Sequence, residues 1–169
     1  LYLNMDKILA GTIIAIWGFT PIRSFKYFVK ILLKITPIIA ASVLVIAAFG
    51  ILSGLAKIDP KFPDIWLVWI VVNLIMHCIT EELIFRYFLQ GNLLRFMTGY
   101  KYAGLISILV SSFTYMLFNS SPSMMYMIGV LIGSIFIGYA YHITKRVEAA
   151  IVVHFTINLI HLFFFTYPI

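Results

Sequence analysis

The sequence predicts an all-α, polytopic transmembrane helix bundle of about six helices with a basic amphipathic surface helix. Hydrophobic residues make up 63% of the 169 residues and charged residues 11%, against roughly 45–50% and 25% in soluble globular proteins. At about 20 apolar residues for each bilayer crossing, this length leaves no room for a separate aqueous domain. We therefore expect residues 1–169 to form a single membrane domain of an integral membrane protein, in a bacterial cell membrane.

The first apolar run, residues 8–19, is short for a crossing. Pro21 and Arg23 follow where a signal peptide would have its small-residue cleavage site, so we expect an uncleaved helix. Because the chain begins with Leu1 and not with Met, a preceding segment is left open. Residues 22–34 carry cations at spacings of three and four with no acid among them, which predicts the amphipathic surface helix; they are Arg23, Lys26, Lys30 and Lys34.

Five further apolar runs, separated by polar or proline-containing turns, predict the remaining helices at residues 35–56, 65–94, 102–118, 124–141 and 149–167. The run 65–94 is longer than one crossing needs, so we expect it to tilt or to emerge from the bilayer. The loops after the first, third and fifth crossings are the basic ones. The positive-inside rule therefore predicts that these loops are cytoplasmic and that both ends of the chain are outside.

Charge and cysteine content exclude several classes of function. The net charge of +6 comes from 12 Lys and Arg against 6 Asp and Glu. These basic residues lie in scattered loop groups, with no aromatic-interleaved patch of the kind that binds nucleic acid. The single cysteine, Cys78, excludes an internal disulfide and a cysteine cluster for metal.

Polar side chains inside apolar helices mark candidate sites, because they are costly in a bilayer and usually face the bundle interior. One stripe at four-residue spacing contains Asn73, His77 and Glu81, beside a second pair, Glu82 and Arg86. The helix 102–118 and its end present Ser107, Ser111, Tyr115 and Asn119, and the last helix presents His154, Asn158 and His161. We expect these three polar edges to face one common interior.

The adjacent carboxylates Glu81 and Glu82 suggest chemistry. Two neighbouring carboxylates in a low dielectric, with one cation from Arg86 nearby, should differ in proton affinity, so that one of them can act as a general base for water. The alternative is that Glu82 and Arg86 form a buried ion pair that only holds helices together. Arg86 does not face Glu81 at this spacing, so function is favoured for Glu81.

Two motifs resemble those of a known family. The string Glu81-Glu82-Leu83-Ile84-Phe85-Arg86 resembles the EExxxR motif of the CPBP family, and His154-Phe155-Thr156-Ile157-Asn158 resembles its HxxxN motif. That family contains CAAX prenyl proteases and bacteriocin-processing or self-immunity proteins, described as intramembrane glutamic endopeptidases. The similarity covers about residues 65–161. The family's FxxxH motif falls by position at Tyr115 to Asn119, where asparagine stands in place of the histidine.

The resemblance implies that Glu81 activates water, that His154 and Asn158 stabilise the tetrahedral oxyanion, and that Arg86 orients Glu82. Asn119 can hydrogen-bond a water but cannot take its proton, so His77 and His161 are considered as substitutes. No cofactor is expected. Zinc held by His154, His77 and Glu81 is a competing mechanism, although no HExxH spacing exists.

Three classes of function therefore stay open. The first is an intramembrane endopeptidase that cleaves a membrane-associated peptide. The second is a pseudo-protease that binds a membrane or cell-envelope protein, in a scaffold or bacteriocin-immunity role. The third, a transporter or channel subunit, requires a continuous wet route across the bilayer.

Depth counting disagrees with a single site. At about 1.5 Å per residue from the basic loops, Glu81 and Asn119 lie roughly 20–27 Å into the bilayer, and His154 lies only about 8–12 Å in. Tilt of the helix 65–94 or a re-entrant connection would remove this difference, and His161 matches the deeper level.

Overall fold

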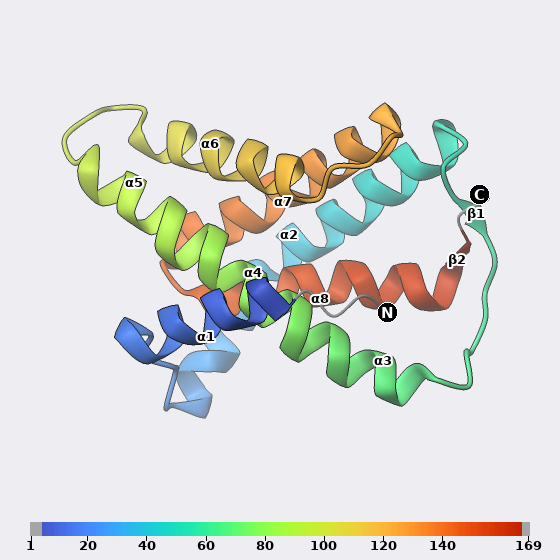
Figure 1. The fold of residues 1–169 in the computed structure, drawn as a ribbon, viewed down its shortest axis with the longest axis horizontal. Coiled ribbons are helices and arrows are strands. Elements are labelled where there is room, and N and C mark those ends of the chain that lie inside the picture. The colour runs from blue at the N-terminus through green and yellow to red at the C-terminus, as the bar shows by residue number, and fades with distance from the viewer. Residues whose placement is uncertain (1–4, 167–169) are drawn as a thin grey trace.

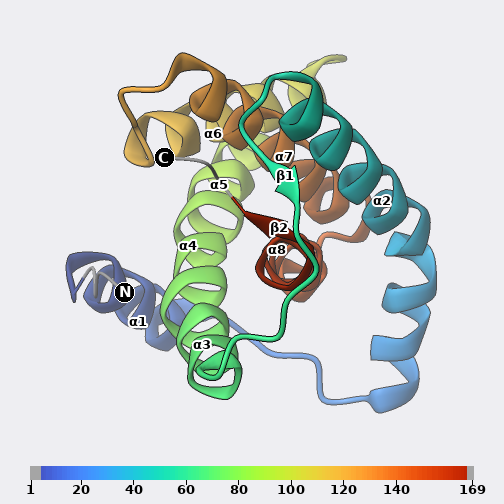
Figure 2. The same cartoon turned by 90° about the vertical axis from the view of Figure 1, so that its right-hand side faces the viewer.

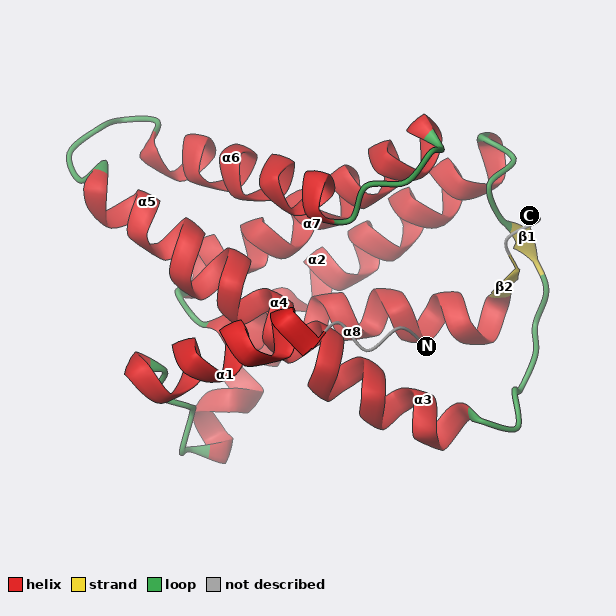
Figure 3. Cartoon of the chain, in the orientation of Figure 1, coloured by secondary structure: helices red, strands yellow, loops and turns green. Residues whose placement is uncertain are grey.

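The computed structural model describes residues 5–166, and within them the protein is an all-α bundle of six helical rods (Figures 1 and 3). Five rods are single helices: α1 (Met5–Gly18), α2 (Phe25–Leu52), α6 (Ala103–Phe118), α7 (Met124–Thr144) and α8 (Val147–Phe164). The sixth runs without interruption over Trp66–Phe96. This rod, α2, α7 and α8 are long and apolar enough to cross a membrane, whereas α6 has 16 residues and α1 has 14. The predicted fold class is confirmed.

The rod Trp66–Phe96 changes its winding along its length. It consists of α3 (Trp66–Val72), the π-helix η1 (Asn73–Ile79), a short α4 (Thr80–Glu82), the π-helix η2 (Leu83–Gln90) and α5 (Gly91–Phe96). A π-helical turn bonds residue i to i+5 and so holds more residues than an α-helical turn. Side chains four residues apart therefore do not keep to one face over the whole rod, although Glu82 and Arg86 in its middle still pair at this spacing. The rod lies obliquely to α8 (Figure 1).

The basic segment 22–34 does not form a separate surface helix. The Ser24 hydroxyl caps α2 by accepting a hydrogen bond from the backbone N–H of Tyr27 (3.4 Å), and the helix then continues through Pro37 to Leu52. No residue near position 34 ends it, because a helix in a bundle tolerates one internal proline. The amphipathic pattern itself is present: the exposed face carries Lys26, Lys30 and Lys34, and the buried face carries Ile31, Ile35 and Ile38.

The end of α8 also differs from the expected helix 149–167, whose last residue, Tyr167, lies outside the described residues. The helix starts at Val147 and ends at Phe164, and β2 (Phe165–Thr166) then pairs antiparallel with β1 (Lys57–Ile58) (Figure 2). The pairing loop also caps the helix, because the backbone N–H groups of Asp59 and Lys61 each donate to an end carbonyl of α8 at 2.8 Å. The Thr166 hydroxyl and the Lys61 ammonium donate to Asp59 and hold its pKa below the usual value.

The core lies where α2, α7 and α8 meet. Helix α2 contributes large residues that include Ile35 and Ile46. Helix α8 contributes Ala149, Ala150 and Val153, which have no exposed surface. Small side chains allow α8 to lie close to its neighbours, as is usual for helix packing in membranes. Large apolar side chains such as Trp17, Leu52 and Phe96 are exposed on the outer faces, which suits contact with lipid acyl chains.

Helix α1 is held against α4 by the absence of a side chain at Gly11. A Cβ atom added there would lie 2.9 Å from both the Cα and the Cβ of Thr80, so only glycine permits this approach. At the other end of α1, the Tyr87 hydroxyl donates to the carbonyl of Gly18 (2.5 Å), and the Phe19 and Tyr87 rings meet edge to face. Gly11 thus fixes the position of α1 next to the motif glutamates.

We predict that Gly11→Ala lowers the free energy of unfolding by about 1–3 kcal/mol, because the new methyl group meets backbone atoms of α4. The measurement is thermal unfolding in detergent. It is monitored through the reaction of a fluorogenic maleimide with Cys78, the single cysteine, which is fully buried in the folded protein. Gly129→Ala is the matched control, because its Cβ would lie 3.4 Å from the Phe49 ring, an ordinary contact. Equal midpoints for the two variants would contradict the assigned role of Gly11.

Candidate active site

Glu82, Arg86 and His154 form one buried cluster. The Arg86 Nε donates to Glu82 Oε2 at 3.0 Å, and the His154 Nδ1 lies 2.7 Å from Glu82 Oε1. Glu82 and Arg86 have no exposed surface, and His154 is 5% exposed. The predicted i, i+4 ion pair is therefore present, and Glu82 also fixes the imidazole of a helix 72 residues away in sequence.

Serine hydroxyls surround the rest of the guanidinium. Arg86 Nη1 donates to Ser111 Oγ (3.0 Å) and Ser112 Oγ (3.4 Å) on α6, and Nη2 donates to Ser134 Oγ on α7 at 2.5 Å. Gly138 permits this arrangement, because a Cβ there would lie 3.0 Å from Arg86 Nη1. A buried charge requires such complete hydrogen bonding. Arg86 consequently links α6 and α7 to the rod Trp66–Phe96.

Glu81 has a different set of partners from Glu82. Its Oε1 accepts from the Lys7 ammonium of α1 at 2.9 Å, and its Oε2 accepts from the Tyr115 hydroxyl of α6 at 2.8 Å. Glu81 is 4% exposed. Adjacent residues on a helix point about 100° apart, which explains why Glu82 turns to Arg86 and His154 while Glu81 turns to α1 and α6.

Asn119 lies at the edge of the same cluster. Its Oδ1 accepts from Lys7 Nζ at 3.3 Å, and its Nδ2 donates to the Tyr115 carbonyl at 3.0 Å. Lys7 thus bridges the Glu81 carboxylate and the amide that stands in place of the motif histidine. A lysine ammonium only donates hydrogen bonds, and an amide cannot take up a proton near neutral pH.

Asn158 is placed close to the cluster but pairs elsewhere. Its Nδ2 donates to Asn73 Oδ1 at 3.2 Å, and Cys78 Sγ donates to the same oxygen at 3.3 Å. Asn73 and Cys78 are five residues apart, the period of the π-helix η1. The expected stripe of Asn73, His77 and Glu81 is therefore divided: Asn73 faces α8, and Glu81 faces α1 and α6.

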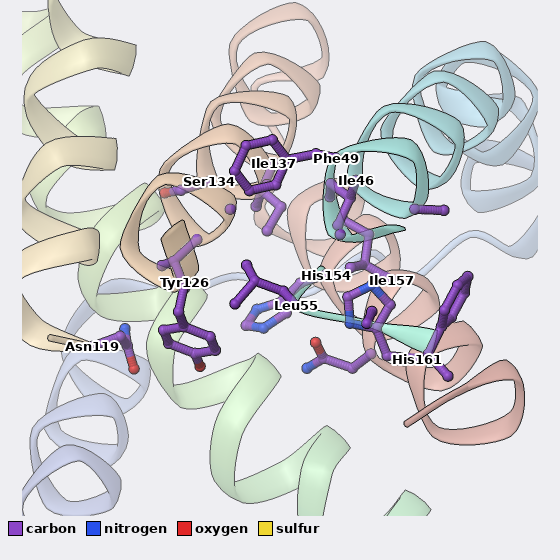
Figure 4. A pocket seen from close by; sticks show the side chains of 18 of the residues that line it. Ile46, Phe49, Leu55, Asn119, Tyr126, Ser134, Ile137, His154, Ile157 and His161 are labelled. Carbon is purple, nitrogen blue, oxygen red and sulfur yellow. The ribbon is translucent and has the colours of Figure 1, made fainter. Parts of the chain in front are cut away.

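A cavity of about 390 Å³ opens beside the cluster. Figure 4 shows His154 in its middle, with Asn119 and Tyr126 to one side and Ile157 and His161 to the other. Its polar lining consists of Tyr115, Asn119, Tyr126, Ser134, His154, Asn158 and His161, and α2 and α7 supply most of its apolar wall. Tyr115 and Asn119 lie between this cavity and Glu81.

The structure therefore brings together most of the predicted site residues. Glu81, Tyr115 and Asn119 form one hydrogen-bonded set with Lys7, and Glu82, Arg86 and His154 form a second. The Tyr115 ring lies between the two sets, 5.8 Å from the Arg86 guanidinium and 6.1 Å from the His154 ring. His161 lies farther along the cavity and contacts the Phe165 ring. His77 is half-buried and makes no hydrogen bond with Glu81 among the residues that the structure describes.

The expected difference in depth between Glu81 and His154 is wrong. Glu82 meets His154 at 2.7 Å, because the long motif rod crosses α8 obliquely instead of running parallel to it (Figure 1). For metal binding, residues 5–166 contain no group of three or more His, Cys, Asp or Glu side chains that could hold an ion.

Sequence reasoning missed Lys7, Ser134 and Gln90. Lys7 lies just before the first apolar run, directly after Asp6, and no spacing in the sequence links it to Glu81. Gln90 is fully buried and donates to the Gly138 carbonyl at 2.9 Å. Its position four residues after Arg86 extends the polar face of the rod.

We predict that Arg86→Met lowers the free energy of unfolding by about 3–5 kcal/mol, because it leaves the Glu82 carboxylate buried without its cation. The double variant Glu82→Gln, Arg86→Met should recover part of this loss, since it buries no net charge. Maleimide reaction at Cys78 during heating measures both. A double variant no more stable than Arg86→Met would show that the charge pairing is not the source of the effect.

Comparison with known proteins adds the family. The family model described as Type II CAAX prenyl endopeptidase Rce1-like matches residues 63–160, more than half of the chain. Searches of curated proteins and of solved structures find no match. The matched region contains both motif glutamates, Arg86, Asn119, His154 and Asn158. This membrane protein, with its buried glutamate, arginine and histidine cluster, belongs to the Rce1-like family of type II CAAX prenyl endopeptidases.

Proposed function

We propose that the protein is an intramembrane endopeptidase that hydrolyses a membrane-associated peptide with water activated by Glu81. The observation that carries the proposal is the Glu82–His154 contact of 2.7 Å, which fixes an imidazole on the wall of the cavity, while Tyr115, which bonds Glu81, lines the same cavity. Family membership supports peptide-bond hydrolysis as the reaction.

In this mechanism, His154 binds the carbonyl oxygen of the substrate. Because Nδ1 faces Glu82, Nε2 is the atom left for the cavity. With the Nδ1–H directed at Glu82, Nε2 donates a hydrogen bond to the substrate oxygen when the ring carries its second proton. Asn158 lines the same cavity one helical turn later. One of its amide N–H groups goes to Asn73, and the other, whose Nδ2 lies 3.7 Å from Cys78 Sγ, is in this proposal the second donor for the developing oxyanion.

Glu81 is the base in this proposal. Both of its oxygens are bonded, to Lys7 and to Tyr115, but a carboxylate oxygen has a further lone pair with which to accept a proton from water. Asn119 and Tyr115 line the cavity between water and Glu81, so they orient the water and do not accept its proton.

The family name points to a prenylated peptide as substrate. The apolar wall that Ile46, Phe49, Val130 and Ile137 provide beside His154 supports an apolar chain attached near the scissile bond. We expect the peptide to enter from the bilayer.

We predict that Glu81→Gln lowers cleavage of a quenched prenyl-peptide library by at least about 100-fold, because an amide cannot accept a proton from water. His154→Ala should cost roughly 10²–10³-fold through loss of an oxyanion donor. Purified protein in detergent is assayed, with His142→Ala, at the far end of α7, as the histidine control that keeps full activity. Cleavage that survives in Glu81→Gln would exclude this mechanism.

The second candidate is a pseudo-protease that binds a membrane or cell-envelope partner in the same cavity, in a scaffold or immunity role. One observation favours it: Asn119 replaces the motif histidine and is bonded to Lys7 and Tyr115. In the same assay, an inactive wild type together with an active Asn119→His would support binding over catalysis.

We further propose that the basic loops face the cytoplasm of a bacterial cell. The loops after α1, α5 and α7 lie at one end of the molecule (Figure 1). The loops after α1 and α7 touch, because Arg146 Nη2 donates to the Thr20 carbonyl at 2.9 Å. Near the same end, Lys34 Nζ of α2 donates to the Ile143 carbonyl of α7 at 2.7 Å. A common basic end supports one cytoplasmic side.

We predict that a membrane-impermeant maleimide labels Asp59→Cys but not Lys101→Cys in intact cells, both in a Cys78→Ser background. The two positions lie in exposed loops on opposite sides of the expected topology. Labelling after cell lysis is the control, because both cysteines should then react. The reverse pattern in intact cells would invert the orientation.

A further inference from the structure

Lys7 supplies the positive charge next to the Glu81 carboxylate, and the other described contact of Glu81 is uncharged. Arg86 is already paired with Glu82, and the second contact of Glu81 is the neutral hydroxyl of Tyr115. Among the described residues, Lys7 is the cation paired with Glu81, at 2.9 Å. A buried carboxylate without a cation would take up a proton instead of remaining charged. A protonated Glu81 has no carboxylate with which to take a proton from water.

The position of Lys7 is determined by the packing of α1. Gly11, one turn after Lys7 on the same helical face, lies against Thr80, and Thr80 precedes Glu81. The close contact between α1 and α4 at Gly11 therefore places the Lys7 side chain next to Glu81. The side chain of Lys7 is 12% exposed and that of Glu81 is 5% exposed, so both charges are largely removed from solvent.

Asn119 provides a second hydrogen-bond acceptor for the Lys7 ammonium. It accepts from Lys7 Nζ at 3.3 Å while its own amide group is held by the Tyr115 carbonyl at 3.0 Å. The ammonium therefore has two defined acceptors from two different helices. An exposed lysine that made a chance contact would not be held in this way.

We propose that Lys7, which lies outside the family-matched region, is a positioning residue that supplies the counter-charge of Glu81 and holds its carboxylate next to Asn119. The catalytic consequence rests on the proposed function. The ion pair itself does not, so the two can fail separately.

The charge of Glu81 is tested with dicyclohexylcarbodiimide, which reacts with protonated carboxyl groups in apolar surroundings, followed by mass spectrometry of the Glu81 peptide. We expect several-fold faster labelling of Glu81 in Lys7→Met than in wild type, and wild-type labelling in Lys7→Arg. Lys26→Met is the matched control, because Lys26 is an exposed cation at the start of α2. Unchanged labelling in Lys7→Met would overturn the inference whatever the cleavage assay shows.

Cleavage kinetics test the consequence. We expect Lys7→Met to lower kcat by at least about tenfold, within the roughly 10²–10⁴-fold that a positioned base contributes, with KM changed by less than about threefold. Adding Asn119→His to Lys7→Met should restore part of kcat, because a histidine there can partner Glu81. If wild type cleaves and Lys7→Met cleaves equally, the inference fails and the proposed function stands. If wild type does not cleave, the proposed function fails and the labelling decides the inference.

Loss of folding in Lys7→Met is separated from loss of charge by the double variant Lys7→Met, Glu81→Gln, which buries no unpaired carboxylate. We expect the double variant to unfold at a higher temperature than Lys7→Met, as reported by maleimide reaction at Cys78. A double variant that is less stable than Lys7→Met would contradict the ion pair.

Discussion

The ion pair of Glu82 and Arg86 is the interaction on which the rest of the site depends. Neither side chain reaches solvent, and their hydrogen bonds extend to three other helices through serines of α6 and α7 and through His154 of α8. Such a pair contributes little net stability, because desolvation offsets most of the attraction. Its effect is on specificity: the pair stays matched within its own helix, but other packings of these apolar helices would leave the remaining guanidinium and carboxylate atoms without their partners on α6, α7 and α8.

The two adjacent glutamates have different partners because the helix that carries them points their side chains in different directions. Glu82 points into the bundle and is neutralised from within the rod, whereas Glu81 points toward α1 and α6 and depends on Lys7. The short α4 between two π-helical stretches sets both directions. Wide π-helical turns are frequent at functional sites, and here they turn Asn73 toward α8 while Glu81 faces away from it.

The sequence predicted the bundle, the motif pair and the shared interior, since each depends on residue type and spacing. Glu82 with Arg86, and the serines and Tyr115 of α6, follow from four-residue periodicity. The π-helical winding was not predictable, because no residue type in 73–90 signals it, and it divided the expected stripe. The continuity of α2 was missed because a change from basic to apolar composition does not itself end a helix. Depth counting failed because it assumed parallel helices.

The exchange of a histidine for Asn119 has to be considered together with Lys7, because the two side chains touch. Histidine can accept and donate protons, and asparagine with an ammonium can only hold a neighbouring carboxylate in place. Asn119 and Lys7 together therefore provide a positive charge next to Glu81, but they provide no second group that could accept a proton. In the proposed mechanism, the proton taken from water therefore ends on Glu81 itself, next to the Lys7 ammonium that pairs with it.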